Sequence, residues 1–181
     1  MKFLLTSCGM LTLLGWMHFP GSIAYPDHFP EPMYDFLQNP LREETVALGR
    51  YLFYEPLLSR DGSISCAACH SSFHAFAHTD HDLSHGIDDQ IGTRNALPLF
   101  NLAWKTSFMW DGAVHHLDMQ ALAPISHPQE MGESLANVIV KLQAHEQYPA
   151  RFAAAFPGEY DSEAEAITGA HLLKALSQFQ L

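Results

Sequence analysis

The feature that most constrains this chain is the pentapeptide Cys66-Ala67-Ala68-Cys69-His70. Two residues between the cysteines allow one short helical turn to present both sulfur atoms to the same edge of a porphyrin, and the next residue is a histidine that can ligate iron. This spacing is the signature of covalent haem attachment, in which each thiol forms a thioether with a vinyl group. We therefore predict one haem c bound to Cys66 and Cys69, with His70 as an axial ligand of the iron.

Three other uses of the two thiols compete with haem attachment. A zinc ribbon needs a second cysteine pair, and the only further cysteine is Cys8. A thioredoxin-like redox pair needs a βαβ setting, which the proline- and histidine-rich flanks do not suggest. A disulfide between Cys66 and Cys69 would close a very short loop and would stabilise the chain little. A zinc- or copper-binding module, in which loop histidines join the two thiols, stays open as an alternative.

Charge and length restrict the partners and the architecture. The chain has 181 residues and a formal net charge of −11, which argues against binding to nucleic acid or to an anionic membrane surface. Hydrophobic residues make up 48% of the sequence, which is enough for the core of one domain. An acidic surface suits a basic protein partner, although it also serves solubility alone.

The first 24 residues are predicted to be a signal peptide. Lys2 is a minimal positive region, an apolar stretch follows up to Phe19, and Ser22-Ile23-Ala24 offers small residues for a cleavage site. This predicts export to the periplasm and a mature chain that starts at Tyr25. A membrane anchor is the alternative, but the stretch is short for one. A lipoprotein anchor at Cys8 is less favoured because the apolar stretch continues past that residue.

Hydrophobic periodicity predicts an all-α, cytochrome c-like haem domain with short helices and long loops. Residues 25–39 are rich in proline and aromatic residues and are expected to form an extended N-terminal arm, followed by one haem domain over 40–181. No stretch alternates as a β-strand would. The polar stretch 71–94 has no sustained period and holds several histidines, so we expect a long functional loop there.

Capping residues place the helices more closely. The first helix is expected to start with Asn39 as its N-cap and to stop at Glu55-Pro56, and Ser65 is expected to cap the short helix of the cysteine motif. Residues 108–112 are expected to form a tight turn with a buried aromatic side chain. Further helices are expected over 117–123, ended by Pro124, from Ser134, over 149–156, and from a capping box of Ser162 and Glu165.

Six short blocks occur in an order that points to a family. They are Leu48-Gly49-Arg50-Tyr51-Leu52-Phe53, Ile64-Ser65-Cys66-Ala67-Ala68-Cys69-His70, Ser84-His85-Gly86, Gly92-Thr93-Arg94-Asn95, Trp110-Asp111-Gly112 and Gln129-Glu130-Met131. From about Pro40 onward the chain resembles the bacterial dihaem cytochrome c peroxidases and their relatives that oxidise tryptophans of proteins or peptides. Family members carry two haem domains. This chain has one Cys-x-x-Cys-His, so it is similar only to the N-terminal, peroxide-binding domain.

The resemblance implies an axial ligand on each side of the iron. His70 would be the proximal ligand, and His85 would be the sixth ligand of the resting haem, which must leave before peroxide binds. His74, His78 and His81 lie in the same loop and compete for that role. A single loop histidine is usually a solvent-exposed residue, so the role of His85 rests on the blocks beside it.

The resemblance also implies roles for four further residues. Glu130 matches the distal acid–base group, which moves a proton between the two oxygens of peroxide. Trp110 matches the aromatic residue that relays electrons between the two haems, although it would also suit a core tryptophan. Arg94 is expected to pair with a haem propionate. Asn95 matches a residue that helps to hold calcium between the two haem domains.

These observations together predict a periplasmic haem peroxidase domain. It would reduce hydrogen peroxide to water with electrons from a small redox protein, a cytochrome c or a cupredoxin. The helical pattern is still running at Leu181, so we expect a second, C-terminal haem domain to be missing, or a homodimer to take its place. The alternative is an electron-transfer cytochrome in which His70 and His85 both stay on iron and no peroxidase activity exists.

Overall fold

The computed structural model describes residues 23–79, 82–158 and 160–181. The predicted signal peptide therefore lies outside the described residues, apart from positions 23 and 24, and so does Cys8. Within the described ranges, no helix is both long enough and apolar enough to cross a membrane.

The described chain is helical, which confirms the predicted fold class. Its α-helices are α1 (Glu43–Phe53), α2 (Cys66–Cys69), α3 (Leu117–Gln120), α4 (Leu122–Ser126), α5 (Leu135–Gln143), α6 (Tyr148–Ala155) and α7 (Gly169–Gln180). Short 3₁₀ turns are η1 (Pro56–Leu58), η2 (Ser72–His74), η3 (Ile87–Asp89), η4 (Leu102–Trp104) and η5 (Glu163–Ala166). In the described residues β-structure is confined to three isolated bridges, which pair Ser71 with Ala77, His85 with Ile91 and Phe108 with Val114.

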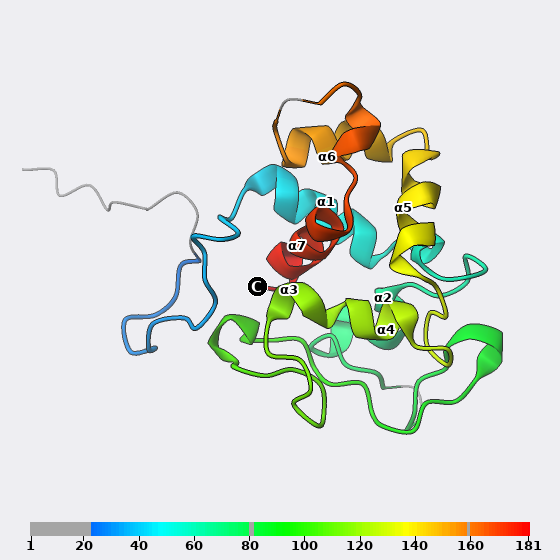
Figure 1. Ribbon diagram of the computed structural model, residues 1–181. Helices are drawn as coiled ribbons and strands as arrows, with labels where there is room; N and C mark the ends of the chain where they lie inside the picture. The colour runs from blue at the N-terminus through cyan, green and yellow to red at the C-terminus, as the bar shows by residue number, and fades with distance from the viewer. Residues whose placement is uncertain (1–22, 80–81, 159) are drawn as a thin grey trace, which may run out of the picture.

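Helices α1 and α7 cross at the centre of the molecule (Figure 1). Gly49 lies at their contact, where a Cβ atom would come within 1.9 Å of the carbonyl oxygen of Ala175. A glycine is therefore needed for the two backbones to approach so closely. The fully buried side chains at this crossing include Leu48, Leu52, Leu172 and Leu176.

The predicted start of the first helix is wrong, because Asn39 has a different task. Helix α1 begins at Glu43 with Arg42 as N-cap, and Asn39 is buried. The Asn39 amide donates to the Tyr34 hydroxyl (2.7 Å), and its oxygen accepts from the amide of Gln178 (2.7 Å). The oxygen of Gln178 accepts from the N–H of Arg42 (3.1 Å), so a side chain of α7 caps α1.

The predicted capping box does not start the last helix either. Ser162 and Glu165 lie at η5, which is only a 3₁₀ turn, and Ser162 makes no side-chain cap there. Helix α7 starts six residues later, where the hydroxyl of Thr168 accepts from the N–H of His171 (3.1 Å). Ile167 is buried just before the helix begins.

The middle helices agree better with the sequence. Ser134 caps α5 as predicted, because its hydroxyl accepts from the N–H of Asn137 (3.2 Å), and α6 matches the helix expected over 149–156. Pro124 does not end a helix. It lies in the first turn of α4, where a missing N–H costs nothing. Ser65 is the N-cap residue of α2 but makes no side-chain cap bond.

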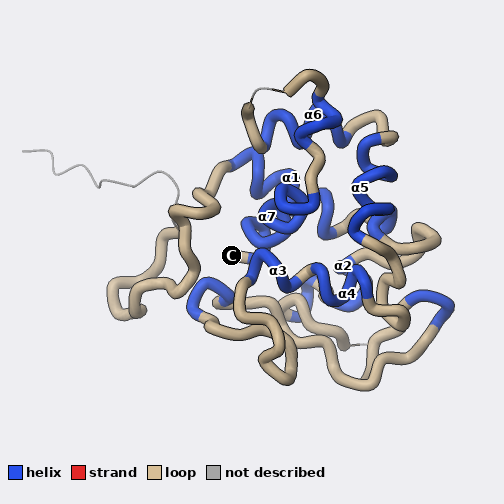
Figure 2. Tube along the Cα trace, in the orientation of Figure 1, coloured by secondary structure: helices blue, strands red, loops and turns tan. Residues whose placement is uncertain are grey.

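One half of the molecule consists mainly of helices, and the other half consists mainly of loops. Figure 2 shows them as tan tube, gathered on one side of the helices. The N-terminal segment packs on this half, since the N–H groups of Met33 and Tyr34 donate to the carbonyl of Ala103 (2.8 and 3.0 Å). The indole N–H of Trp104 donates back to the carbonyl of Pro30 (2.7 Å).

Candidate haem site

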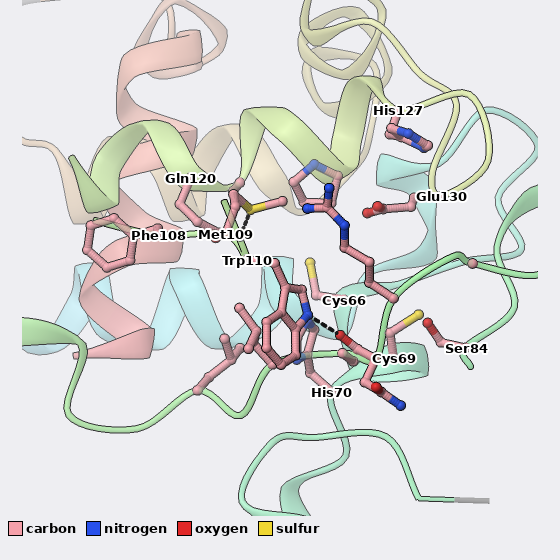
Figure 3. A pocket seen from close by; sticks show the side chains of 18 of the residues that line it. Cys66, Cys69, His70, Ser84, Phe108, Met109, Trp110, Gln120, His127 and Glu130 are labelled. Atoms are coloured by element: carbon pink, nitrogen blue, oxygen red, sulfur yellow. Dashed lines mark hydrogen bonds between the residues drawn. The ribbon is translucent and has the colours of Figure 1, made fainter. Parts of the chain in front are cut away.

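A cavity of about 450 Å³ lies between the helices and the loops. This volume is within the usual range for cofactor pockets. The cysteine motif forms one part of its wall, and loop 92–99, the turn 107–111, helices α3 and α4 and the segment 127–131 form much of the remainder. Figure 3 shows Cys66, His70, Trp110 and Glu130 around this space.

His70 is fixed by the turn that follows it. Its Nδ1 donates to the carbonyl of Phe76 (2.7 Å), since a carbonyl can only accept, and the bridge between Ser71 and Ala77 closes the turn. Burial lowers the pKa of His70, although hydrogen bonds to the carbonyls of Phe76 and Leu97 oppose this. A neutral imidazole protonated on Nδ1 keeps its lone pair on Nε2, which is the state that an iron ligand needs.

The two cysteines are free thiols rather than a disulfide. Burial raises the pKa of Cys66 to about 12, and burial is also the main reason that the pKa of Cys69 is raised. Thiols with raised pKa values are poor nucleophiles for redox exchange and poor thiolate ligands for zinc. The raised pKa values therefore argue against the redox pair and the zinc site, and they leave haem attachment as the remaining use of the motif.

The described residues give no support to the zinc or copper module. They contain no group of three His, Cys, Asp or Glu side chains placed to hold a metal ion. His74 pairs through Nδ1 with the hydroxyl of Thr79 (3.0 Å). His81 lies outside the described residues.

Glu130 lines the cavity, and its backbone is held by the block around Gly86. The N–H of Ile87 donates to the carbonyl of Glu130 (2.8 Å). A Cβ on Gly86 would lie 2.0 Å from the carbonyl oxygen of Gln129, so only glycine allows this approach. The block around Gly86 and the block around Glu130 are far apart in the chain, but they pack together and fix the backbone that carries the Glu130 carboxylate.

An ion pair between Glu133 and Lys141 also holds the segment that carries Glu130. Glu133 is buried and its carboxylate lies 2.6 Å from the ammonium of Lys141. Lys141 also donates to the carbonyls of Ser59 (2.6 Å) and Arg60 (3.2 Å), and the N–H of Arg60 donates to the carbonyl of Met131 (2.9 Å). The segment carrying Glu130 is thus tied to the chain just before the cysteine motif.

Trp110 also lines the cavity, but it is 57% exposed. It sits in the turn closed by the bridge of Phe108 and Val114, and its indole N–H donates to the carbonyl of Asn95 (2.8 Å). The buried aromatic side chain predicted for this turn is Phe108. Met109 adopts a positive φ of 70°, a conformation that is uncommon for a bulky residue.

Arg94 and Asn95 are both at the cavity, as part of loop 92–99. The guanidinium of Arg94 pairs with the carboxylate of Asp111 (3.2 Å), so it links this loop to the turn of Trp110. The amide of Asn95 donates to the backbone carbonyl of Asp82.

The structure does not bring His85 into the cavity. Its imidazole pairs through Nδ1 with the carboxylate of Asp89, and it is not among the residues that line the site. Its backbone carbonyl lies 3.9 Å from the sulfur of Cys69. Gly86, the next residue in the chain, is the one that packs against the backbone of Gln129 and Glu130.

The cavity also contains residues to which the sequence analysis gave no functional role, among them Lys105, Met109, Gln120 and His127. Gln120 donates to the sulfur of Met109 (3.7 Å), which joins α3 to the turn of Trp110. Gln120 could have been noticed as a polar residue within an apolar helical stretch. His127 carries no such signal, because only the folding of segment 127–131 against the cavity gives it a place there.

The fold and this site define a c-type haem protein: two free thiols, a half-buried neutral imidazole and a largely apolar-lined cavity fit covalent haem. The chain belongs to the di-haem cytochrome c peroxidase family, whose sequence profile matches residues 43–181. This confirms the resemblance seen in the sequence.

Two relatives show the range of the family. The methylamine utilization protein MauG of Methylorubrum extorquens is 38% identical over 161 residues, covering 86% of this chain and 41% of MauG. The cytochrome c peroxidase Ccp of Escherichia coli is 29% identical over 176 residues, covering 93% of this chain and 36% of Ccp. The chain thus spans less than half the length of these relatives.

Solved structures agree on the fold. A MauG-like protein associated with microbial copper homeostasis superimposes with a TM-score of 0.75 at 33% identity, covering 86% of this chain and 45% of that one. The diheme peroxidase BthA of Burkholderia thailandensis gives a TM-score of 0.65 at 23% identity, covering 78% of this chain and 39% of its own. The second likeness supports the fold alone.

Proposed function

We propose that this chain is the peroxide-binding haem domain of a periplasmic cytochrome c peroxidase. The reaction is the reduction of hydrogen peroxide to water, with electrons from a small redox protein such as a cytochrome c or a cupredoxin. The observation that carries the proposal is the placement of the Glu130 carboxylate in the same cavity as Cys66, Cys69 and His70.

The residues of the chain divide the work. A haem, when bound, supplies the iron that binds peroxide and exchanges electrons. Cys66 and Cys69 would hold it covalently, and His70, oriented by the Phe76 carbonyl, would ligate its iron. Glu130 would move a proton from one oxygen of peroxide to the other, so that water can leave.

Trp110 is the proposed path for electrons. It lines the cavity and is exposed on its other side, so it can contact both the haem and a partner. That partner is a second haem domain or a second copy of the chain. Arg94 is proposed to bind a haem propionate, and Asn95 to contribute to a calcium site shared with the partner.

A bis-histidine electron carrier is the second candidate, and the placement of His85 argues against it. His85 is paired with Asp89 and is not among the residues that line the cavity, whereas His70 and Glu130 both line it. We therefore propose an open distal site. A third candidate is the oxidation of a partner protein, because relatives of this chain include MauG; it would use the same cavity with a different substrate.

The test compares variants of the haem-loaded chain by stopped-flow absorption after mixing with hydrogen peroxide. Glu130→Gln keeps the size of the side chain and should slow the reaction by about 10²-fold, the scale for losing an acid–base group. His85→Ala should leave both the rate and the resting spin state unchanged. An unaffected rate in Glu130→Gln would refute the acid–base role, and a change from low to high spin in His85→Ala would restore His85 as a ligand.

A further inference from the structure

An array of aromatic rings connects the proximal ligand to the protein surface. The ring of Phe53, which is buried and lines the cavity, lies 6.5 Å from the ring of His70 between centroids. On its other side, Phe53 lies 5.5 Å from the ring of Tyr54. Phe76 and Phe179 complete this proximal aromatic array, at 5.7 and 5.2 Å from Phe53.

Tyr54 is the outer end of the array. It is 44% exposed, and it is the one member of the array that can be oxidised under the conditions of a peroxidase, since phenylalanine cannot. The ring of Tyr54 is also 6.4 Å from that of Phe179, so it contacts the array in two places. Two ring-to-ring steps therefore separate a solvent-exposed phenol from the proximal ligand.

We propose that Tyr54 is a redox-active residue, which gives up one electron through Phe53 and His70 when peroxide reacts at the haem. This inference rests on the proposed function. Reduction of one hydrogen peroxide to two waters consumes two electrons and two protons. One electron comes from the bound haem, and the second has to come from a second cofactor or from a side chain of this chain.

The fate of the proton favours Tyr54 over Trp110 as the lasting site of oxidation. An oxidised phenol becomes a neutral radical when it releases its hydroxyl proton, and the exposed Tyr54 can release it to water. The indole N–H of Trp110 is bound to the carbonyl of Asn95 (2.8 Å), which accepts a hydrogen bond but is too weak a base to take the proton. An oxidised Trp110 therefore keeps its charge, which makes it a less stable site of oxidation than Tyr54. An external reductant then returns one electron, and water returns the proton.

Tyr51 provides a matched control. It lies in α1, three residues before Tyr54, which is the C-cap residue of that helix, and it is 52% exposed. Tyr51 is outside the array and packs under the guanidinium of Arg151, which lies 3.7 Å from its ring centroid. Replacing either tyrosine by phenylalanine keeps the ring and removes only the oxidisable hydroxyl. Neither change removes a buried contact.

The experiment treats the haem-loaded chain with hydrogen peroxide and records electron paramagnetic resonance spectra after rapid freezing. Ring-deuterated tyrosine identifies a tyrosyl signal by the collapse of its hyperfine splitting. We expect this signal in the parent chain and in Tyr51→Phe, and its loss in Tyr54→Phe. Phe53→Leu should delay its appearance, because it interrupts the aromatic path.

The outcomes separate the two proposals. No change in the haem absorption on adding peroxide would refute the proposed function. A normal absorption change without a tyrosyl signal, or with a signal that persists in Tyr54→Phe, would overturn the role of Tyr54 and leave the peroxidase proposal standing. A signal that is lost in Tyr51→Phe instead would also overturn it.

Discussion

The Nδ1–H group of His70 donates a hydrogen bond to the carbonyl oxygen of Phe76, at 2.7 Å, across a turn in which Ala75 and Phe76 both have positive φ. Two successive left-handed residues that are not glycine store strain, and strain of this kind concentrates at functional sites. Here it turns the Phe76 carbonyl back toward the imidazole that the haem iron needs.

The strained turn gives a first prediction. Ala75 is exposed, so substitutions there act through the backbone rather than through packing. Ala75→Val should lower the free energy of unfolding of the haem-loaded chain by about 1–3 kcal/mol, because a β-branched residue fits a positive φ poorly. Ala75→Gly, measured by urea unfolding alongside it, should change the free energy by less than about 1 kcal/mol. Equal effects of the two changes would show that the turn is not left-handed.

Covalent attachment is tested by extraction. Haem should stay with the protein in acid-acetone, because thioether bonds survive where iron ligation does not. Cys66→Ala and Cys69→Ala should each weaken attachment, and the double variant should lose all haem. Ser65→Ala is the control next to the motif, since Ser65 makes no side-chain cap bond. Complete extraction from the parent chain would exclude a c-type haem.

The close approach of Gly86 to the backbone of Gln129 gives a third prediction. Gly86→Ala places a Cβ 2.0 Å from the backbone oxygen of Gln129, so the chain must shift, at a cost of about 3 kcal/mol. The control is Gly92→Ala, whose nearest neighbour is the Ser84 carbonyl at 3.3 Å, and which should cost little. Thermal unfolding compares them. Similar melting temperatures would mean that Gly86 does not contact the segment of Glu130.

The pair of Glu133 and Lys141 should make stability depend on pH. Burial raises the pKa of Glu133, but hydrogen bonds from Lys141, from the Ser134 N–H and from Asn137 outweigh it and leave the pKa lowered. The pair therefore stabilises the fold above the unfolded pKa of a glutamate, near 4.3, and this contribution is lost as pH falls through the lower, folded pKa.

Glu133→Gln measures that contribution. At pH 7 it should cost about 3 kcal/mol, since it leaves the Lys141 ammonium without its partner charge. When the pH is lowered from 6 to about 3, the free energy of unfolding measured in urea should fall less for Glu133→Gln than for the parent chain. Parallel declines would show that Glu133 does not contribute to the pH dependence.

The two capping sites before α7 can be compared directly. Thr168→Ala removes the side chain that accepts from the N–H of His171 and should cost about 1 kcal/mol. Ser162→Ala should cost less than about 0.5 kcal/mol, as surface changes away from such features do. Chemical unfolding of both variants decides between them; a larger loss in Ser162→Ala would restore the capping box as the start of the helix.

The sequence by itself determined the class of the protein. Covalent haem chemistry needs two thiols and a histidine at one fixed spacing, and such a local requirement can be recognised without a fold. The all-α class and the cap at Ser134 were also local, because helix periodicity and N-capping involve residues only a few positions apart.

Only the tertiary structure decided what depends on contacts between distant segments. Asn39 looks like an N-cap in the sequence, yet Gln178, nearly the whole domain away, takes that role and leaves Asn39 to a buried network. His85 and His127 are both loop histidines, and no local pattern shows that the first pairs with Asp89 while the second lines the same cavity as Glu130. The physical reason is that a side chain's direction in an irregular loop is set by the surfaces packed against it, and these come from elsewhere in the chain.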